Sequence, residues 1–416
     1  MTATKRIFAF LILVAVSSCI DPYFPNLKNY QSLLVVEGLI TNENSSYKVK
    51  LSRTTSREDS APEKVSDADV NIIDGNGIKA HLQNSGDGYY MTDSTAIKGV
   101  IGQKYTLQIL TSDGKEYRSE ECTMLPVTGI NTLYYEKGEE FSGNPAEAFT
   151  GLKIFLNSDD ATGMNKYFRW TFEEVWKFII PGVQKYTYIF IDDTTFSFPS
   201  VPVVNDLCWK SSKSGEIITN SILPGGATYI DKQLIQFIAP VKSDRLSQEY
   251  SILVKQYSVS KKEFDFWNDL QKVNEAGGDI FDSQPYKVIS NIHNVNDANE
   301  MVLGYFEVSA VSQKRMFITA RELDPLFLPH YETSCVEIAK SPDDWPNPQP
   351  TWDQIYHWFT DIYGYVFVMP VTTNGTILEG TVYRRNLLDF IFSTKACASC
   401  EPAGFSAKPD FWVDPK

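Results

Sequence analysis

The 416-residue chain lacks the features of nucleic-acid-binding and multi-span membrane proteins. No basic block appears after Arg6, and 52 acidic against 38 basic side chains give a formal net charge of -14. Nucleic-acid binding needs clustered lysines and arginines that neutralise phosphates, so no nucleic-acid partner is expected. Beyond residue 16 no apolar run reaches the roughly 20 residues that a transmembrane helix requires. The 43% hydrophobic content is nevertheless enough for real cores and argues against disorder.

Catalytic signatures are also missing. The chain has no G-x-S-x-G elbow, no H-E-x-x-H motif and no phosphate-binding loop. The four histidines are scattered, at His81, His293, His330 and His357. The densest acidic pairs, Asp159-Asp160 and Asp192-Asp193, are typical of solvated turns. We therefore expect no catalytic residue, no metal and no cofactor, and keep a hydrolase with dispersed carboxylates as a less favoured alternative.

Tryptophan is absent from the first 169 residues, whereas all eight tryptophans lie at or beyond Trp170. A chain of this length is expected to form two domains, and so sharp a change in composition indicates that their cores differ. We predict a β-sandwich domain over residues 32–126, a linker or long crossing loop over 127–150, and a larger β-rich domain over 151–416.

Only six cysteines are present. If Cys19 is set aside, five remain, and an odd number leaves at least one thiol outside a bridge. Cys122 is the candidate for that thiol, because it lies by itself in the N-terminal half. We expect two disulfides among the other four in an exported protein, with their connectivity open: Cys208, Cys335, Cys397 and Cys400. A four-cysteine zinc site is the alternative.

The N-terminus has the three parts of a secretory signal. Lys5 and Arg6 supply positive charge, an apolar run follows over residues 7–16, and Ser17 and Ser18 are small. Val16-Ser17-Ser18-Cys19 resembles the bacterial lipobox, in which the cysteine is acylated and becomes the first mature residue, although Ser18 replaces the usual Gly or Ala. We therefore predict a signal peptide over residues 1–18, lipidation at Cys19, and a tether over 19–31 that holds the protein to a membrane.

The pattern after the tether is mainly that of short strands. Residues 32–126 alternate apolar and polar positions between Gly-rich turns, and an Asp-Gly turn at Asp113 separates two of the strands. In the second half, capping boxes predict helices that begin at Ser260 and at Thr351.

Aromatic residues crowd a proline-rich part of the second half. They are candidates for binding a glycan, a peptide or a protein partner, although burial in the core is the favoured interpretation: Trp345, Trp352, Tyr356 and Trp358.

An ordered set of stretches resembles the lipoprotein family catalogued as domain of unknown function 4249. These stretches are LLVVEGLITN, YKVKLSRT, YSVSKKEFDFWNDL, GGDIFDSQPYKVISNIHN, VLGYFEVSAVSQKRMFI and CASCEPAGFSAKPDFW. The resemblance implies an immunoglobulin-like or carboxypeptidase-regulatory-like N-terminal sandwich. It also implies a Gram-negative bacterium and a gene beside that of a TonB-dependent outer-membrane receptor. The activity of the family is not established, so the resemblance assigns no catalytic residue.

These observations lead to one expected function and two alternatives. We expect a non-enzymatic outer-membrane lipoprotein that assists a TonB-dependent transporter in nutrient capture. The sequence does not indicate on which face of the membrane it lies. A free-standing glycan- or peptide-binding lipoprotein is the first alternative, and the hydrolase is the second.

Overall fold

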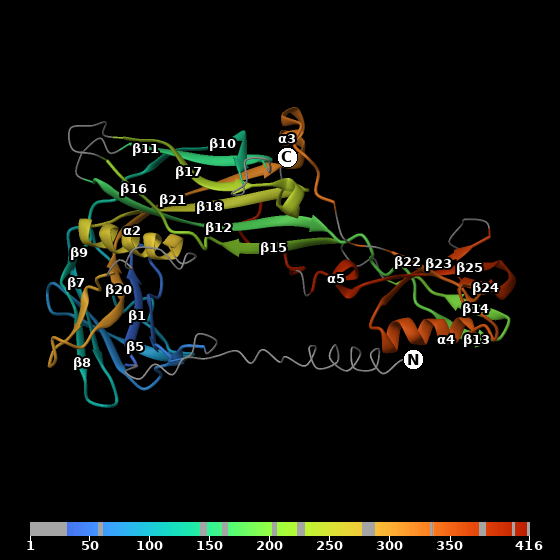
Figure 1. Cartoon of the computed structure of the whole chain (residues 1–416), viewed down its shortest axis with the longest axis horizontal. Helices are drawn as coiled ribbons and strands as arrows, with labels where there is room; N and C mark the ends of the chain where they lie inside the picture. The colour runs from blue at the N-terminus through green and yellow to red at the C-terminus, as the bar shows by residue number, and fades with distance from the viewer. Residues whose placement is uncertain are drawn as a thin grey trace, which may run out of the picture. The chain divides into compact units, whose positions relative to one another are not determined.

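The computed structural model of the chain describes residues 31–56, 61–141, 148–159, 165–201, 206–222, 229–276, 288–332, 335, 337–373, 380–401 and 404–413. It divides into two compact units (Figure 1). Unit 1 comprises residues 1–123 and 289–308, and unit 2 comprises 124–288 and 309–416. Both consist mainly of β-strands, which confirms the predicted fold class. The predicted signal peptide, Cys19 and nearly all of the tether lie outside the described residues.

The strands of unit 1 form one hydrogen-bonded path in the order β19-β8-β7-β4-β5-β6-β2-β1-β20. Two further strands lie beside this path: β3 pairs with β2, and β9 pairs with β7. The strand β5 belongs to both halves of the path, because its first residues pair with β4 and its last with β6. The strands are β1 (Leu34–Ile40), β2 (Lys48–Arg53), β3 (Glu63–Lys64), β4 (Asp69–Asp74), β5 (Lys79–Gly86), β6 (Tyr89–Met91), β7 (Lys104–Leu110), β8 (Glu116–Ser119), β9 (Cys122–Thr123), β19 (Ile292–Asn294) and β20 (Val302–Val308).

Unit 1 is completed by a segment that lies far along the chain. β20 pairs in parallel with β1, and Gly304, at φ +84°, lies so close to the Val36 carbonyl that a Cβ could not fit. The buried amide of Asn291 donates to the Phe306 carbonyl and accepts from its N–H, both at 2.9 Å. These two bonds satisfy backbone groups of β20 as a neighbouring strand would.

This arrangement corrects two boundaries predicted from the sequence. The predicted linker over residues 127–150 contains strand β10 (Ile130–Phe141), paired with β11 (Ala148–Asp159) over its whole length. The run MVLGYFEVSAV, which the predicted range 151–416 places wholly in the second domain, is divided between the units: β20 belongs to unit 1, and β21 (Ala310–Thr319) to unit 2. β10 is the edge strand of its sheet and most of its side chains are exposed, so its sequence lacks the apolar alternation that marks a half-buried strand.

A hydrogen-bonded carboxylate also fixes the returning segment of unit 1. Glu300 accepts from Lys115 Nζ at 3.0 Å, from the Tyr117 hydroxyl at 2.8 Å and from Asn294 Nδ2 at 2.7 Å. Burial by itself would raise the pKa of Glu300, but these donors outweigh it and hold the pKa below its usual value. Burial, together with the Glu300 carboxylate, raises the pKa of Tyr117 to about 12.

The stability of unit 1 is therefore expected to depend on Glu300 at low pH. A depressed folded-state pKa contributes stability above the unfolded-state value, and this contribution is lost as the pH falls through the folded-state pKa. Tyr117 has the opposite sign, so its contribution is fully present below its ordinary pKa of 10.0 and is lost as the pH rises toward about 12. Calorimetry from neutral pH into the acid range should show a falling melting temperature for unit 1, and Glu300→Gln should flatten that fall. An acid limb unchanged by Glu300→Gln would contradict this assignment.

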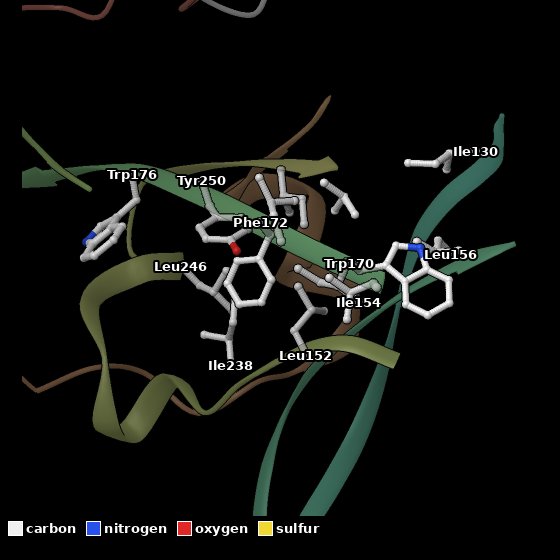
Figure 2. Packing of buried hydrophobic residues seen from close by; sticks show 14 of the residues in the cluster. Ile130, Leu152, Ile154, Leu156, Trp170, Phe172, Trp176, Ile238, Leu246 and Tyr250 are labelled. Carbon is white, nitrogen blue, oxygen red and sulfur yellow. The ribbon is translucent and has the colours of Figure 1, made fainter. Parts of the chain in front are cut away.

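Unit 2 contains a β-sandwich whose two sheets enclose one apolar core. The three-stranded sheet has the order β10-β11-β17, and the other has the order β15-β12-β18-β21 with β16 beside β12. Figure 2 shows side chains of β11, such as Leu152 and Ile154, packed with Phe172 and Tyr250 of the larger sheet. The remaining strands are β12 (Tyr167–Ile179), β15 (Leu207–Lys213), β16 (Ile218–Ser221), β17 (Tyr229–Ile238) and β18 (Glu249–Ser258).

Both predicted capping boxes mark the start of a helix. Helix α2 (Lys261–Ala276) begins where Ser260 Oγ accepts from the Glu263 N–H at 3.2 Å. Helix α4 (Trp352–His357) begins where Thr351 and Gln354 bond reciprocally, side chain to backbone. The other α-helices described are α3 (Ala320–Leu323) and α5 (Lys395–Ala398).

A second core in unit 2, here called the aromatic module, surrounds α4. Its sheets have the orders β13-β14-β24 and β22-β25-β23. Its strands are β13 (Ile189–Asp192), β14 (Thr195–Phe198), β22 (Ile338–Lys340), β23 (Val366–Thr372), β24 (Gly380–Tyr383) and β25 (Leu387–Ser393).

Candidate functional site

The aromatic candidates of the sequence gather in the core of the aromatic module. Trp352 is 4% exposed and lies with its ring centroid 4.7 Å from that of Phe390. Trp345, Tyr356 and Trp358 are half-buried and pack against the same cluster. These rings are mostly committed to packing, as the favoured interpretation anticipates, and they do not form an open platform for a ligand.

The four candidate disulfide cysteines form two bridges. Cys208 pairs with Cys400, and Cys335 pairs with Cys397. Cys397 and Cys400, which form a C-x-x-C sequence, therefore have separate, distant partners, and the bridges use the four thiols that a zinc site would have needed. Cys122 lies outside both bridges, and its Sγ accepts from Asn291 Nδ2 at 3.3 Å.

The histidines and acidic pairs do not converge. His81 lies 3.1 Å from Asp69 in unit 1, and His357 lies 2.7 Å from Asp361 on the helical turn after α4. Asp192 caps its own turn by accepting from the Thr194 N–H, and Asp160 lies outside the described residues. Among the residues that the structure describes, no group of three His, Cys, Asp or Glu side chains could hold a metal ion.

Three cavities of unit 2 lie around the connection from β17 to β18. This connection holds two short 3₁₀ turns, η1 (Pro240–Lys242) and η2 (Asp244–Leu246). The cavities share its residues and measure about 400, 480 and 340 Å³. Ser243 lines the first two, whereas Ser247 and Tyr331 line the second and third. Cavities of this size are typical of binding sites.

The second cavity is mainly apolar and has an aromatic residue at its edge. Leu246, Leu323 and Leu328 line it, and Phe327 is 86% exposed. The Phe327 backbone is left-handed, with φ 49° and ψ 51°, a conformation that costs about 1 kcal/mol or more for a residue with a side chain. Lys137 Nζ donates to the preceding Leu326 carbonyl at 2.7 Å. An exposed ring on a constrained backbone beside an apolar cavity has the properties of an anchor for a partner surface.

A buried carboxylate supports the wall of the first cavity. Glu174 of β12 is 1% exposed; it accepts from the Tyr250 hydroxyl at 2.6 Å, from Arg245 Nε at 3.3 Å and from Gln236 Nε2 at 3.3 Å. Burial, with the nearby carboxylate, raises the pKa of Tyr250 well above its usual value, so its hydroxyl remains a donor. The Arg245 guanidinium also stacks 4.6 Å from the Trp176 ring. These contacts fix the guanidinium at the cavity wall.

Sequence reasoning missed these cavity residues. Lys242 and Arg245 lie in a short polar connection that resembles an ordinary turn, and Phe327 lies in an unremarked Leu-Phe-Leu-Pro run. The available signals were Pro240 and an aromatic residue placed between two prolines, Pro325 and Pro329. Neither signal says what surrounds these residues, because the segments that line the first two cavities lie about 90 to 105 positions apart in the chain.

Comparison with known families matches residues 20–315 to the family described as Domain of unknown function (DUF4249). This range covers more than half of the chain, so the protein belongs to that family, as the resemblance indicates. The matched range includes Lys242 and Arg245 and ends before Phe327 and before the closing cysteine-rich stretch. No curated protein was found to match the chain.

Proposed function

We propose that this protein is a lipid-anchored outer-membrane lipoprotein without enzymatic activity, which binds a TonB-dependent transporter and assists it in nutrient capture. The observation that carries the proposal is the exposed Phe327 beside the apolar cavity of unit 2. Large exposed apolar residues next to a preformed cavity favour protein docking, since such an anchor would bury its ring in a partner.

Two further features support this assignment. The lipobox at Cys19 would attach the chain to a membrane, and no helix in the described residues is long and apolar enough to cross one. Disulfides persist in the oxidising envelope rather than in the cytosol, which agrees with export. The transporter as the partner follows from the gene setting that the family resemblance implies, which is an associational argument.

A pull-down from outer membranes solubilised in mild detergent tests the proposal. The full-length protein, tagged at its C-terminus, should retain a TonB-dependent receptor in stoichiometric amounts, and Cys19→Ala should lose it by losing the membrane. Phe327→Ser should lose at least about 90% of the receptor, since a central aromatic anchor contributes about 2 kcal/mol or more to a protein interface. Tyr229→Ser, at another exposed aromatic that lines none of the three cavities, serves as the matched control.

If the wild-type protein emerges without a receptor, the accessory function fails. The glycan- or peptide-binding alternative then takes its place. Equal recovery with Phe327→Ser and Tyr229→Ser would retain the accessory function but remove Phe327 as its docking residue.

A further inference from the structure

The first cavity combines three aromatic rings with cationic side chains. Phe141 at the end of β10, Phe149 on β11 and Phe237 on β17 contribute the rings. Lys242 and Arg245 contribute positive charge from the β17–β18 connection. At about 400 Å³ the cavity is large enough for a ligand with one or two rings.

Lys242, one of the two cationic residues that line the cavity, has no ion-pair partner among the described residues, although the chain is acidic overall. Lys242 Nζ lies 3.4 Å from the centroid of the Phe149 ring, and Lys153 Nζ lies 6.0 Å from that of Phe237. Neither ammonium makes an ion pair with any residue in the described ranges. Glu140 is the carboxylate among the described lining residues, and it does not pair with either of them. Lys153 does not line the cavity, so the Lys242 ammonium is the unpaired cation among the described lining residues, and it favours a negatively charged ligand.

Arg245 has hydrogen-bonding capacity that its protein partners leave unused. Its Nε donates to Glu174 and its Nη1 donates to Ser243 Oγ at 2.9 Å, whereas Nη2 donates to no atom of the described residues. The guanidinium is already held by these bonds and by Trp176, so a ligand would not have to order it. A planar guanidinium is well suited to a carboxylate oxygen, because its N–H groups lie in one plane.

We propose that this cavity binds a small organic anion: a carboxylate attached to an apolar, ring-containing body. The carboxylate accepts from Arg245 Nη2 and contacts the Lys242 ammonium, while the apolar body packs on Phe141 and Phe237. Binding here requires no partner protein, so this inference is independent of the transporter.

Isothermal titration of the purified full-length protein with 1-naphthaleneacetate, and with its neutral amide as the matched ligand, tests the inference. The acid should bind at least about tenfold more tightly than the amide, because only the acid makes charge-assisted contacts. Lys242→Ala and Arg245→Lys should each weaken binding of the acid by about tenfold, and Lys242→Glu should abolish it. Arg245→Lys keeps a cation beside Glu174, so the buried carboxylate remains paired.

Lys213→Glu provides the control for a general change in charge, since that lysine is 81% exposed and does not line the cavity. It should leave the affinity for the acid unchanged. The proposal is overturned if the acid shows no saturable binding, if acid and amide bind equally, or if Lys242→Glu binds the acid as tightly as the wild type does.

Discussion

Replacing Glu174 with alanine is expected to lower the free energy of unfolding of unit 2 by about 3–5 kcal/mol. The carboxylate is buried and accepts hydrogen bonds from Tyr250, Arg245 and Gln236. Its removal leaves three donors without their acceptor, and the Arg245 charge, whose side chain is 26% exposed, without its counter-ion. Unpaired charge in a partly buried site costs more than the ion pair contributes, so the loss exceeds that of an ordinary surface change.

Urea unfolding followed by tryptophan fluorescence measures this loss. All eight tryptophans belong to unit 2, so the signal reports this unit and not unit 1. The adjacent Glu173 offers a matched control, because its carboxylate is 44% exposed and lies 3.9 Å from Lys213. Glu173→Ala should cost at most about 0.5 kcal/mol. Similar losses for the two variants would mean that the Glu174 network does not stabilise the sandwich.

Removal of the Cys208–Cys400 bridge is expected to have an effect of similar size. The two cysteines are 192 positions apart, and the chain-entropy relation gives about 5 kcal/mol for a loop of that length. Cys208 is fully buried and packs with Phe178 and Ile180, so the double variant Cys208→Ala/Cys400→Ala also loses apolar contacts. The bridge Cys335–Cys397 spans 62 positions, and its removal should cost less by the same relation.

Reducing agent distinguishes the bridge from the packing around it. The wild-type protein should unfold at a lower urea concentration with dithiothreitol than without it, again by tryptophan fluorescence. In the double variant this difference should shrink to the part that Cys335–Cys397 contributes. Cys122→Ala, which leaves both bridges intact, should keep the full response. A reductant response in the double variant equal to that of the wild type would show that the Cys208–Cys400 bridge does not stabilise unit 2.

Local patterns could be interpreted correctly because their causes are local. Period-two alternation and an Asp-Gly turn predict the hairpin of β7 and β8, and the structure pairs these strands around Gly114 at φ +83°. The boxes at Ser260 and Thr351 mark the starts of α2 and α4, because capping bonds join residues only three positions apart. The mainly β fold follows from the same short-range signals.

Interactions between distant segments could not be inferred in this way. β20 joins unit 1 because Asn291 bonds the Phe306 backbone and Gly304 allows close approach to Val36. In the sequence, nothing distinguishes Asn291 or Gly304 from an ordinary asparagine or glycine of a strand or loop. The strand β10 could not be inferred either, because its polar residues are typical of a linker and only the structure shows that they pair with β11.

The sequence by itself determined the mainly β class, the starts of two helices, and the membership in a family to which no activity is assigned. It also singled out the four bridging cysteines, whose chemistry is visible from their number and from the predicted export. Only the tertiary structure decided how those cysteines pair and which unit holds residues 289–308. It also placed Lys242 and Arg245 beside Phe149 and Phe237, and it exposed Phe327 next to a cavity. The physical reason is that a binding site is defined by distances between segments, whereas sequence patterns record what neighbouring residues do to one another.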